Sequence, residues 1–147
     1  MTLVYGADKD VSDWVSRQIF GVPGQFEKSK AIGVVENSKL IAGVVYNNQY
    51  SRPDGDPYMI EMSVASIDKK WATRHNLRAF FSIPFIQYKL ERIQTHCKAD
   101  DEGVIMFNKR LGFNPEGYHR QHWPSGGDSI SWSMLRHECR WINGGLS

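Results

Sequence analysis

A single carboxylate, Glu61, interrupts the apolar stretch Tyr58–Ser66, and a polar, cationic segment, Ile67–Asn76, follows it directly. The stretch predicts a mostly buried strand, and the apolar spacing of Leu77–Leu90 predicts a helix after the segment. A strand that feeds into a helix brings the free N–H groups of the helix N-terminus to the strand's carboxyl end, which is a ready anion site. A buried carboxylate beside a phosphate site indicates an acid/base enzyme that uses a phosphorylated cofactor.

Length and composition predict one compact domain over residues 1–147, because 41% of the residues are hydrophobic and 23% are charged. Apolar runs such as Ala79–Ile86 are interrupted by polar residues or by Pro84, so we expect no membrane partner and a cytoplasmic location. Cys97 and Cys139, the only cysteines, are expected to be reduced. Neither they nor any pair of histidines has the spacing of metal ligands, and we therefore expect no metal site.

The cationic group Lys69, Lys70, Arg74 and Arg78 has two interpretations. It is either a solvated helix start or a local basic patch, since the net charge of +2 is too small to indicate nucleic-acid binding by itself. Five Trp and six Tyr are a high aromatic content for this length. Core packing is the commoner place for any one of them, although some could line a groove.

The remaining apolar segments predict strands at Leu3–Tyr5, Ala31–Val35, Leu40–Tyr46, Arg92–Lys98, Tyr118–Arg120 and Ser129–Leu135. The turn Glu36–Lys39 joins two of them as an antiparallel hairpin, and the turn residues Ser51–Pro57 separate that hairpin from the central strand. Because a helix connects the central strand to Arg92–Lys98, these two strands should be parallel.

Helix boundaries follow from capping residues. Asp10 is expected to cap a first helix, and Asp100 or Asp101 a later one that ends at Gly112. Pro84 should kink the helix after Asn76 because an interior proline removes a hydrogen bond. A last helical turn is expected within 136–142, and fraying is expected from 143 onward.

The predicted order of strand, helix, hairpin, central strand, helix, strand, helix and two strands resembles the GNAT superfamily of N-acyltransferases. The resemblance extends over Ala31–Leu135 and includes Arg110–Gly117, which reads R-L-G-F-N-P-E-G. This octapeptide is similar to the K-L-G-F-x-x-E-G signature of the Rim-type branch, which acetylates the N-termini of ribosomal proteins. The resemblance implies an α+β fold with a mixed, mostly antiparallel central sheet, one parallel strand pair at the cofactor site, and flanking helices.

Acetyl-CoA, or another acyl-CoA, is the co-substrate that the resemblance implies. In the superfamily its pantetheine arm pairs with the central strand, and its pyrophosphate rests on the amides of the following loop. Carried over to this sequence, the cofactor-binding residues are Val64, Ser66, Trp71, Thr73, Arg74, His75, Asn76 and Asn108.

The loop departs from the superfamily motif Q/R-x-x-G-x-G/A. Trp71 stands at the polar first position, Arg74 at the middle glycine and Asn76 at the small last residue. Glycine normally lets the backbone approach the phosphates closely. Two readings stay open: Arg74 and Asn76 donate to phosphate through their side chains, or the cofactor site is weak or altered.

Glu61 is the catalytic candidate, because several members of the superfamily use a glutamate at this place as a general base. An ammonium group is not a nucleophile, so a base must remove a proton before the amine attacks the thioester. The alternative is a structural Glu61 that pairs with an Arg or with backbone donors. Ser63 shares its strand face and could orient a water molecule or simply pack.

The general acid of the superfamily is a tyrosine at the position of Asn108. Because an amide cannot donate a proton as an acid, either Tyr118 supplies it or the CoA thiolate leaves without one. His96 is expected to be buried and satisfied by backbone groups. For His119 and His122 either a surface role or contact with substrate is expected.

Three functions are therefore considered. The first is an acetyl-CoA-dependent N-acetyltransferase that acts by direct attack of a small-molecule or peptide amine. The second is a catalytically degenerate binding protein on the same fold, favoured by the altered loop and by Asn108. The third is an acyltransferase that modifies a nucleic-acid amine, suggested by the cationic loop and the aromatic content. A monomer or a homodimer is compatible with each of them.

Overall fold

The computed structural model describes residues 1–143 as a mixed sheet of seven strands in the order β1-β2-β3-β4-β5-β7-β6. The strands are β1 (Thr2–Tyr5), β2 (Lys30–Glu36), β3 (Lys39–Ser51), β4 (Pro57–Ser66), β5 (Arg92–Lys98), β6 (Asn114–His119) and β7 (Ser129–Leu135). The helices are α1 (Asp8–Phe20), α2 (Arg74–Ser82) and α3 (Glu102–Leu111). Within residues 1–143 every strand pairing is antiparallel except the parallel pair β4 and β5, so the predicted fold class is confirmed.

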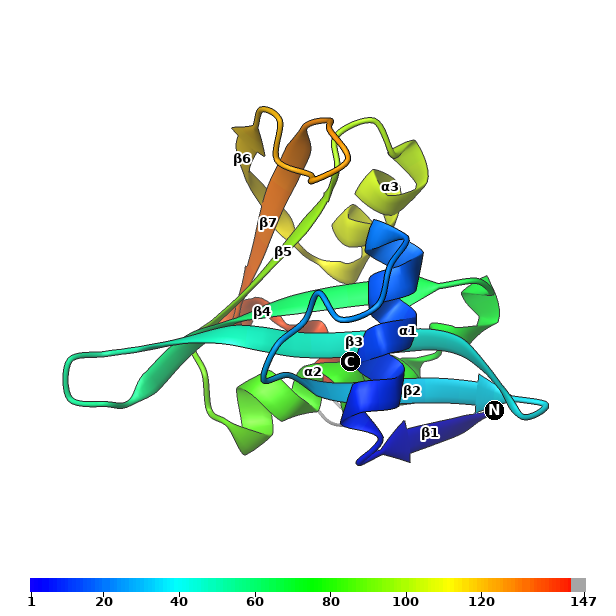
Figure 1. The fold of residues 1–147 in the computed structure, drawn as a ribbon. Helices are drawn as coiled ribbons and strands as arrows, with labels where there is room; N and C mark the ends of the chain where they lie inside the picture. Colours follow the sequence, from blue (N-terminus) through cyan, green and yellow to red (C-terminus); the bar gives the residue numbers. More distant parts are fainter. Residues whose placement is uncertain (144–147) are drawn as a thin grey trace.

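β4 and β5 pair only at their beginnings, where Met59, Ile60 and Glu61 lie opposite Arg92, Ile93 and Gln94. Beyond Glu61, β4 stays paired with β3 as far as Ser66, whereas β5 stays paired with β7. The two strands therefore diverge, and in Figure 1 β5 and β7 rise steeply away from β4. The divergence opens a wedge in the middle of the sheet.

Helix α1 covers one face of the sheet and crosses in front of β3 and β4 (Figure 1). It begins at Asp8 after the cap residue Ala7, so the predicted cap at Asp10 is wrong; Asp10 lies in the first turn, where the helix dipole favours a carboxylate. Asp8 instead accepts a hydrogen bond from the backbone N–H of Ala31 (3.0 Å) and so ties the helix start to β2.

Helix α2 covers the opposite face, where Leu77, Phe80 and Phe81 join the main core. The predicted kink at Pro84 takes the form of a π-helical turn over Ile83–Gln87, in which the N–H of Tyr88 donates to the carbonyl of Ile83 (3.0 Å). A π turn lengthens the hydrogen-bonded ring by one residue. The wider turn accommodates Pro84, which has no N–H of its own.

Helix α3 closes the upper part of the wedge. Asp101 caps it by accepting from the N–H of Val104 (3.1 Å), and Gly112 ends it with φ of 105°, as the sequence predicts. Two 3₁₀ turns, Arg136–Glu138 and Arg140–Ile142, follow β7 in place of one continuous last turn. The predicted fraying of the end concerns residues 144–147, which lie outside the described residues.

Two strands are longer than their side-chain patterns predict. β3 continues past Tyr46 to Ser51, because the β3–β4 hairpin keeps its backbone pairing through the polar residues, with irregularities on both sides of Tyr50. β6 begins at Asn114 rather than Tyr118, although Pro115 and Gly117 are poor strand formers. In both cases a neighbouring strand supplies hydrogen-bond partners that the single-strand pattern cannot reveal.

Glycines set the distance between α1 and the sheet. Gly33 and Gly43 lie opposite each other on β2 and β3, beneath Val11 and Val15 of the helix. A Cβ atom on Gly43 would meet Val15 Cγ2 at 2.8 Å and Val11 Cγ1 at 3.0 Å, closer than side chains tolerate. The position of α1 therefore depends on the missing side chain.

We expect Gly43→Ala to lower the free energy of unfolding by about 1–3 kcal/mol, because the added methyl group overpacks the helix–sheet interface. Urea denaturation monitored by tryptophan fluorescence measures the loss. Combining Gly43→Ala with Val15→Ala should recover part of the lost stability. Additive losses in the double variant would contradict the contact between Gly43 and Val15. Gly103→Ala is the matched control, since it lies in exposed α3 with only Asp101 Oδ1 within 4 Å and should be neutral or stabilising.

Candidate active site

The wedge between β4 and β5 holds two adjoining cavities. The larger, of about 310 Å³, we call the wedge cleft, and the smaller, of about 190 Å³, the acidic cavity because Glu61 lines it. Both are lined by Ile19, Met62, Val64, Thr95, His96 and Trp123. A ligand in one cavity therefore lies directly beside a ligand in the other.

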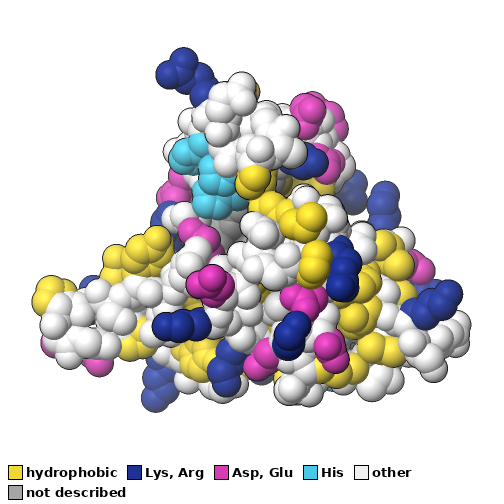
Figure 2. All heavy atoms as spheres, in the orientation of Figure 1, with side chains coloured by type: hydrophobic (Ala, Val, Ile, Leu, Met, Phe, Trp, Pro, Cys, Tyr) yellow, Lys and Arg dark blue, Asp and Glu magenta, His cyan; other side chains and the backbone are white. Residues whose placement is uncertain are grey.

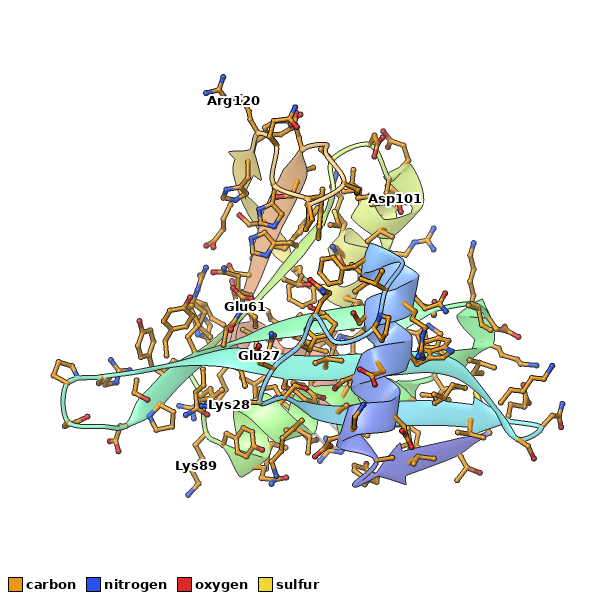
Figure 3. All side chains as sticks on the ribbon, viewed as in Figure 1. Glu27, Lys28, Glu61, Lys89, Asp101 and Arg120 are labelled. Carbon is orange, nitrogen blue, oxygen red and sulfur yellow. The ribbon has the colours of Figure 1, made fainter. Side chains whose placement is uncertain are left out.

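Glu61 lines the acidic cavity at the point where β4 and β5 part, as Figure 3 shows. Asn48 Nδ2 donates to its Oε2 at 2.9 Å, and the neighbouring Asn47 also lines the cavity. The Oδ1 atom of Asn47 is buried and has no hydrogen-bond partner among residues 1–143. The cavity therefore offers the carboxylate of Glu61 to a donor that enters it, whereas the Asn47 oxygen is enclosed by protein.

Aromatic rings form the other side of the acidic cavity. Phe20 contacts Phe26 (ring centroids 5.7 Å apart) and Trp123 (6.1 Å), and all three residues line the cavity. The indole N–H of Trp123 donates to the carbonyl of Asp128 at 3.1 Å, which fixes the ring. The cavity thus joins a polar end at Glu61 to an apolar aromatic wall.

The wedge cleft brings together three of the residues assigned to the cofactor, Val64, Ser66 and Asn108. Val64 and Ser66 come from the part of β4 that has parted from β5, and Asn108 is a buried residue of α3. Phe107 and Leu111 supply apolar surface, whereas Lys98 and Asp101 lie at the polar rim. Ser63, the other predicted polar residue of β4, lines the acidic cavity instead.

The loop that was expected to present backbone amides to a phosphate uses many of them internally. The N–H groups of Ile67, Lys70, Trp71, Ala72 and Thr73 donate to Ile41 O, Asp68 Oδ1, Asp68 O, Lys69 O and Trp71 O. The side chain of Thr73 caps α2 by accepting from the N–H of Asn76 (3.1 Å). The loop is therefore stabilised by its own hydrogen bonds.

Two of the residues assigned to the cofactor have structural contacts in this loop. Trp71 is 2% exposed and stacks on Phe80 (5.0 Å), with an edge contact to Phe107 of α3 (5.9 Å). Asn76 is buried, and its Nδ2 donates to the carbonyl of Trp71 at 2.8 Å. Both residues therefore stabilise the loop and the start of α2 from within the protein.

Side chains of the cationic group differ in their contacts and in their exposure. Lys70 forms ion pairs with Glu36 and with Asp68 (3.4 Å), and together they raise the pKa of Lys70. Arg78 Nη1 lies 3.4 Å from the carbonyl of Trp141. Lys69, Arg74 and His75 are exposed at the same turn. None of these three is among the described lining residues of either cavity.

Tyr118 lies outside the described lining of both cavities. It is 62% exposed on β6, and its hydroxyl donates to Asp128 Oδ2 at 2.5 Å. This hydrogen bond raises the pKa of Tyr118 and lowers that of Asp128. The structure therefore does not bring Tyr118 together with Glu61.

Three histidines lie together beside the acidic cavity, which His96 and His122 line, and Figure 2 shows a group of histidine side chains on this face. The ring of His96 stacks on that of His122 (4.7 Å, 12° between planes), and His119 lies 5.5 Å from His96 and 5.8 Å from His122. Within residues 1–143 no group of His, Cys, Asp and Glu side chains has the arrangement of a metal site. His96 is half-buried and faces the cavities rather than being enclosed in the core as expected.

The polar face of the sheet explains why these histidines converge. Register partners place Glu61 beside Gln94, His96 beside Ser131, and Ser131 beside Gly117, so these residues share one face. His119 Nε2 lies 2.9 Å from Ser131 Oγ. A Cβ on Gly117 would meet both Ser131 Oγ (2.9 Å) and His119 Nε2 (3.1 Å), so only glycine leaves room for this contact.

Sequence reasoning missed His96, although the sequence carries a signal for it. In Arg92–Lys98 strongly polar residues alternate with the less polar Ile93, Thr95 and Cys97, and in Ser129–Leu135 three serines alternate with Ile130, Trp132 and Met134. Such alternation predicts one polar face on each strand. Because the two strands pair, a shared polar face that includes His96 follows once their register is known.

The sheet order and the parted β4 and β5 define the fold of the GNAT N-acyltransferases, as the resemblance implies. No protein-family model matches the sequence, and no curated protein sequence matches it. Among solved structures, a mutant of spermidine N-acetyltransferase from Vibrio cholerae is similar at 15% identity, with a TM-score of 0.70 over 97% of this chain and 96% of that one. A ribosomal-protein alanine acetyltransferase from Vibrio fischeri is similar at 15% identity and a TM-score of 0.68, over 94% of each chain. A ribosomal-protein alanine N-acetyltransferase from Escherichia coli gives 0.59 at 15% identity, over 91% of this chain and 92% of that one.

Helices long and apolar enough to cross a bilayer are absent from residues 1–143.

The pKa of His96 tests the arrangement of His96, His119 and His122 beside Glu61. Burial lowers its pKa below the ordinary value of 6.5, His122 and His119 lower it further, and Glu61 opposes them. The unfolded chain therefore binds more protons than the folded one between pH 6.5 and the folded pKa, so the free energy of unfolding falls as the pH falls through this window.

We expect His122→Gln to raise the pKa of His96 and Glu61→Gln to lower it, as measured from its imidazole proton shifts by NMR. In urea denaturation, the free energy of unfolding should fall less between pH 8 and pH 5.5 for His96→Gln than for the wild type. The exposed His137→Gln is the matched control and should change neither quantity. A His96 that titrates at or above pH 6.5 would contradict the cluster.

Proposed function

We propose that this protein is an N-acyltransferase that uses acetyl-CoA or another acyl-CoA to acylate a small-molecule or peptide amine. The observation that carries the proposal is the pair of adjoining cavities between the parted strands, one lined by β4 and α3, the other containing Glu61. Direct transfer needs the thioester and the amine side by side. The fold supports the proposal, since its structural neighbours include spermidine and ribosomal-protein alanine N-acetyltransferases.

The wedge cleft is the place for the acyl donor. Where β4 has lost β5 as a partner, its backbone can pair with the amide groups of a pantetheine arm as an added strand would. Val64 and Ser66 lie on this stretch, and Phe107 and Leu111 offer apolar contact. The exposed Lys69, Arg74 and His75 are candidates for binding the phosphates.

The acidic cavity is the place for the acceptor. An ammonium group at Glu61 would find a carboxylate to accept its hydrogens. The rings of Phe20, Phe26 and Trp123 favour an acceptor with an apolar or aromatic body beside its amine. The volume of about 190 Å³ limits the enclosed part of the acceptor to a small group or one end of a longer molecule.

Glu61 is the candidate general base of this proposal. It would accept a proton from the bound ammonium group, directly or through a water molecule oriented by Ser63, and leave a nucleophilic amine beside the thioester. The hydrogen bond from Asn48 holds one carboxylate oxygen, so the other stays available to the acceptor. No covalent enzyme intermediate is required.

Glu61→Gln tests this role. We expect kcat/KM for the acceptor to fall about 100- to 10,000-fold, the range of general acid–base contributions. Calorimetry with acetyl-CoA should give an unchanged Kd, because Glu61 lines only the acidic cavity. Turnover would be measured by release of CoA thiol over a panel of polyamines, aromatic alkylamines and peptides with free N-termini.

The matched control is Glu27→Gln, an exposed carboxylate on the connection between α1 and β2 that lies outside the described lining of both cavities. Figure 3 labels it on the same side of the molecule as Glu61. It should leave both turnover and affinity unchanged. Full activity of Glu61→Gln would remove Glu61 from the chemistry.

A second candidate is a binding protein that has lost catalysis on this fold. The loop after β4 favours this candidate, because many of its backbone N–H groups already donate within the protein and fewer remain for a pyrophosphate. The buried Trp71, whose carbonyl accepts from Asn76, stabilises the loop in this form. Wild-type protein that binds neither CoA nor acetyl-CoA in calorimetry would support this candidate over the first. Binding to DNA or RNA that weakens steeply with salt would instead favour a nucleic-acid acceptor.

A further inference from the structure

His96 is the ionisable residue shared by the two cavities among their described lining residues. Glu61 and His122 line only the acidic cavity, and Cys97, Lys98 and Asp101 line only the wedge cleft. A group that exchanges protons with both the amine and the thioester must reach both, and the position of His96 satisfies this requirement.

In the acyl transfer proposed above, no residue has yet been assigned to protonate the departing CoA thiolate. The departing CoA thiolate needs a proton, but Asn108 is an amide and Tyr118 hydrogen-bonds to Asp128 outside the described lining of the cavities. Cys97, which does line the wedge cleft, is a poor substitute, because burial raises the pKa of its thiol. None of these three side chains is suited to supply the proton, whereas His96 lies at the junction of the two cavities.

We propose that His96 is a second catalytic residue, which takes a proton from the attacking amine and delivers it to the CoA sulfur. This inference rests on the proposed function and extends it. The direct observation is that His96 lines both cavities on the same sheet face as Glu61.

The protons and bonds balance with two groups. Glu61 takes the first proton from the ammonium group and later releases it to solvent. His96 takes the second proton from the same nitrogen as the C–N bond forms. It gives that proton to the sulfur as the C–S bond breaks, and it ends the cycle neutral. The products are the N-acyl amine, CoA thiol and one proton in solution.

The surroundings of His96 suit this cycle. It must begin neutral in order to accept a proton, and burial together with His122 and His119 lowers its pKa. Glu61, facing it from β4, favours the imidazolium form and so steadies the charge that develops during the transfer. The stacked ring of His122 and the fixed ring of His119 hold the imidazole in place.

His96→Gln is the first variant for the test. We expect kcat to fall about 100-fold, within the range of general acid–base effects, while the Kd of acetyl-CoA measured by calorimetry stays within twofold. A kcat within twofold of wild type would overturn the proposal. A simultaneous loss of acetyl-CoA affinity would also overturn it, because His96 would then serve to build the cleft.

The pH profile separates a proton-transfer role from a structural one. In wild type, kcat/KM should fall on the acid side with the pKa that NMR measures for His96, and this limb should be absent from His96→Gln. His122→Gln should move the limb to higher pH by the amount that it moves the pKa of His96. A limb that stays in place would overturn the proposal, and His137→Gln serves as the unchanged control.

The same measurements distinguish failure of the proposed function from failure of the proposal for His96. Wild-type protein that neither binds acetyl-CoA nor acylates any amine of the panel overturns the proposed function and this inference with it. Wild-type turnover that requires Glu61 but survives the loss of His96 overturns the inference alone.

Discussion

The parting of β4 and β5 is the constraint on which the rest of the molecule depends. Three residue pairs hold the two parallel strands together, and beyond Glu61 each strand keeps only its other neighbour. A sheet interrupted in this way needs cover on both faces, and α1 and α2 provide it, with α3 over the opening. The same interruption exposes unpaired backbone and polar side chains in the interior of the fold, where a ligand can reach them.

Close contact between layers fixes where this opening lies. Gly33 and Gly43 bring α1 down onto β2 and β3, and the end of α1 supplies Ile19 and Phe20 to the cavities. On the far side Gly117 lets the ring of His119 reach Ser131. These glycines therefore set the positions of α1 and of the His119 ring, and a methyl group at any of them would displace a neighbouring side chain.

Much of the fold follows from local patterns. The hairpin at Glu36–Lys39, the cap at Asp101, the end of α3 at Gly112 and the parallel pair around the central strand are all predicted from turn chemistry and connection rules. The position of Glu61 at the opening follows from its place on that strand. The ends of β3 and β6 do not follow, because pairing with a neighbour, rather than side-chain pattern, extends them.

The site itself is less accessible to sequence reasoning. Trp71 looks like a replaced motif residue, and only the folded structure reveals that its ring packs between Phe80 and Phe107. His96 looks like a core residue until the register of β5 and β7 places it on the polar face. His119 and His122 come from a distant part of the chain, so no spacing along the sequence could join them to His96.

In the loop after β4, many backbone N–H groups already donate hydrogen bonds within the protein, and this has one further consequence. Backbone amides that cradle a phosphate at close range are shielded from the surrounding electrolyte, whereas exposed side-chain cations are screened by it over about 8 Å at physiological ionic strength. With many of the turn's amides already bonded, the proposed donor would depend on exposed side chains such as Lys69, Arg74 and His75 for its phosphates. Capture of a nucleotide-bearing donor by this protein would therefore weaken with added salt more than capture by a glycine-rich cradle does.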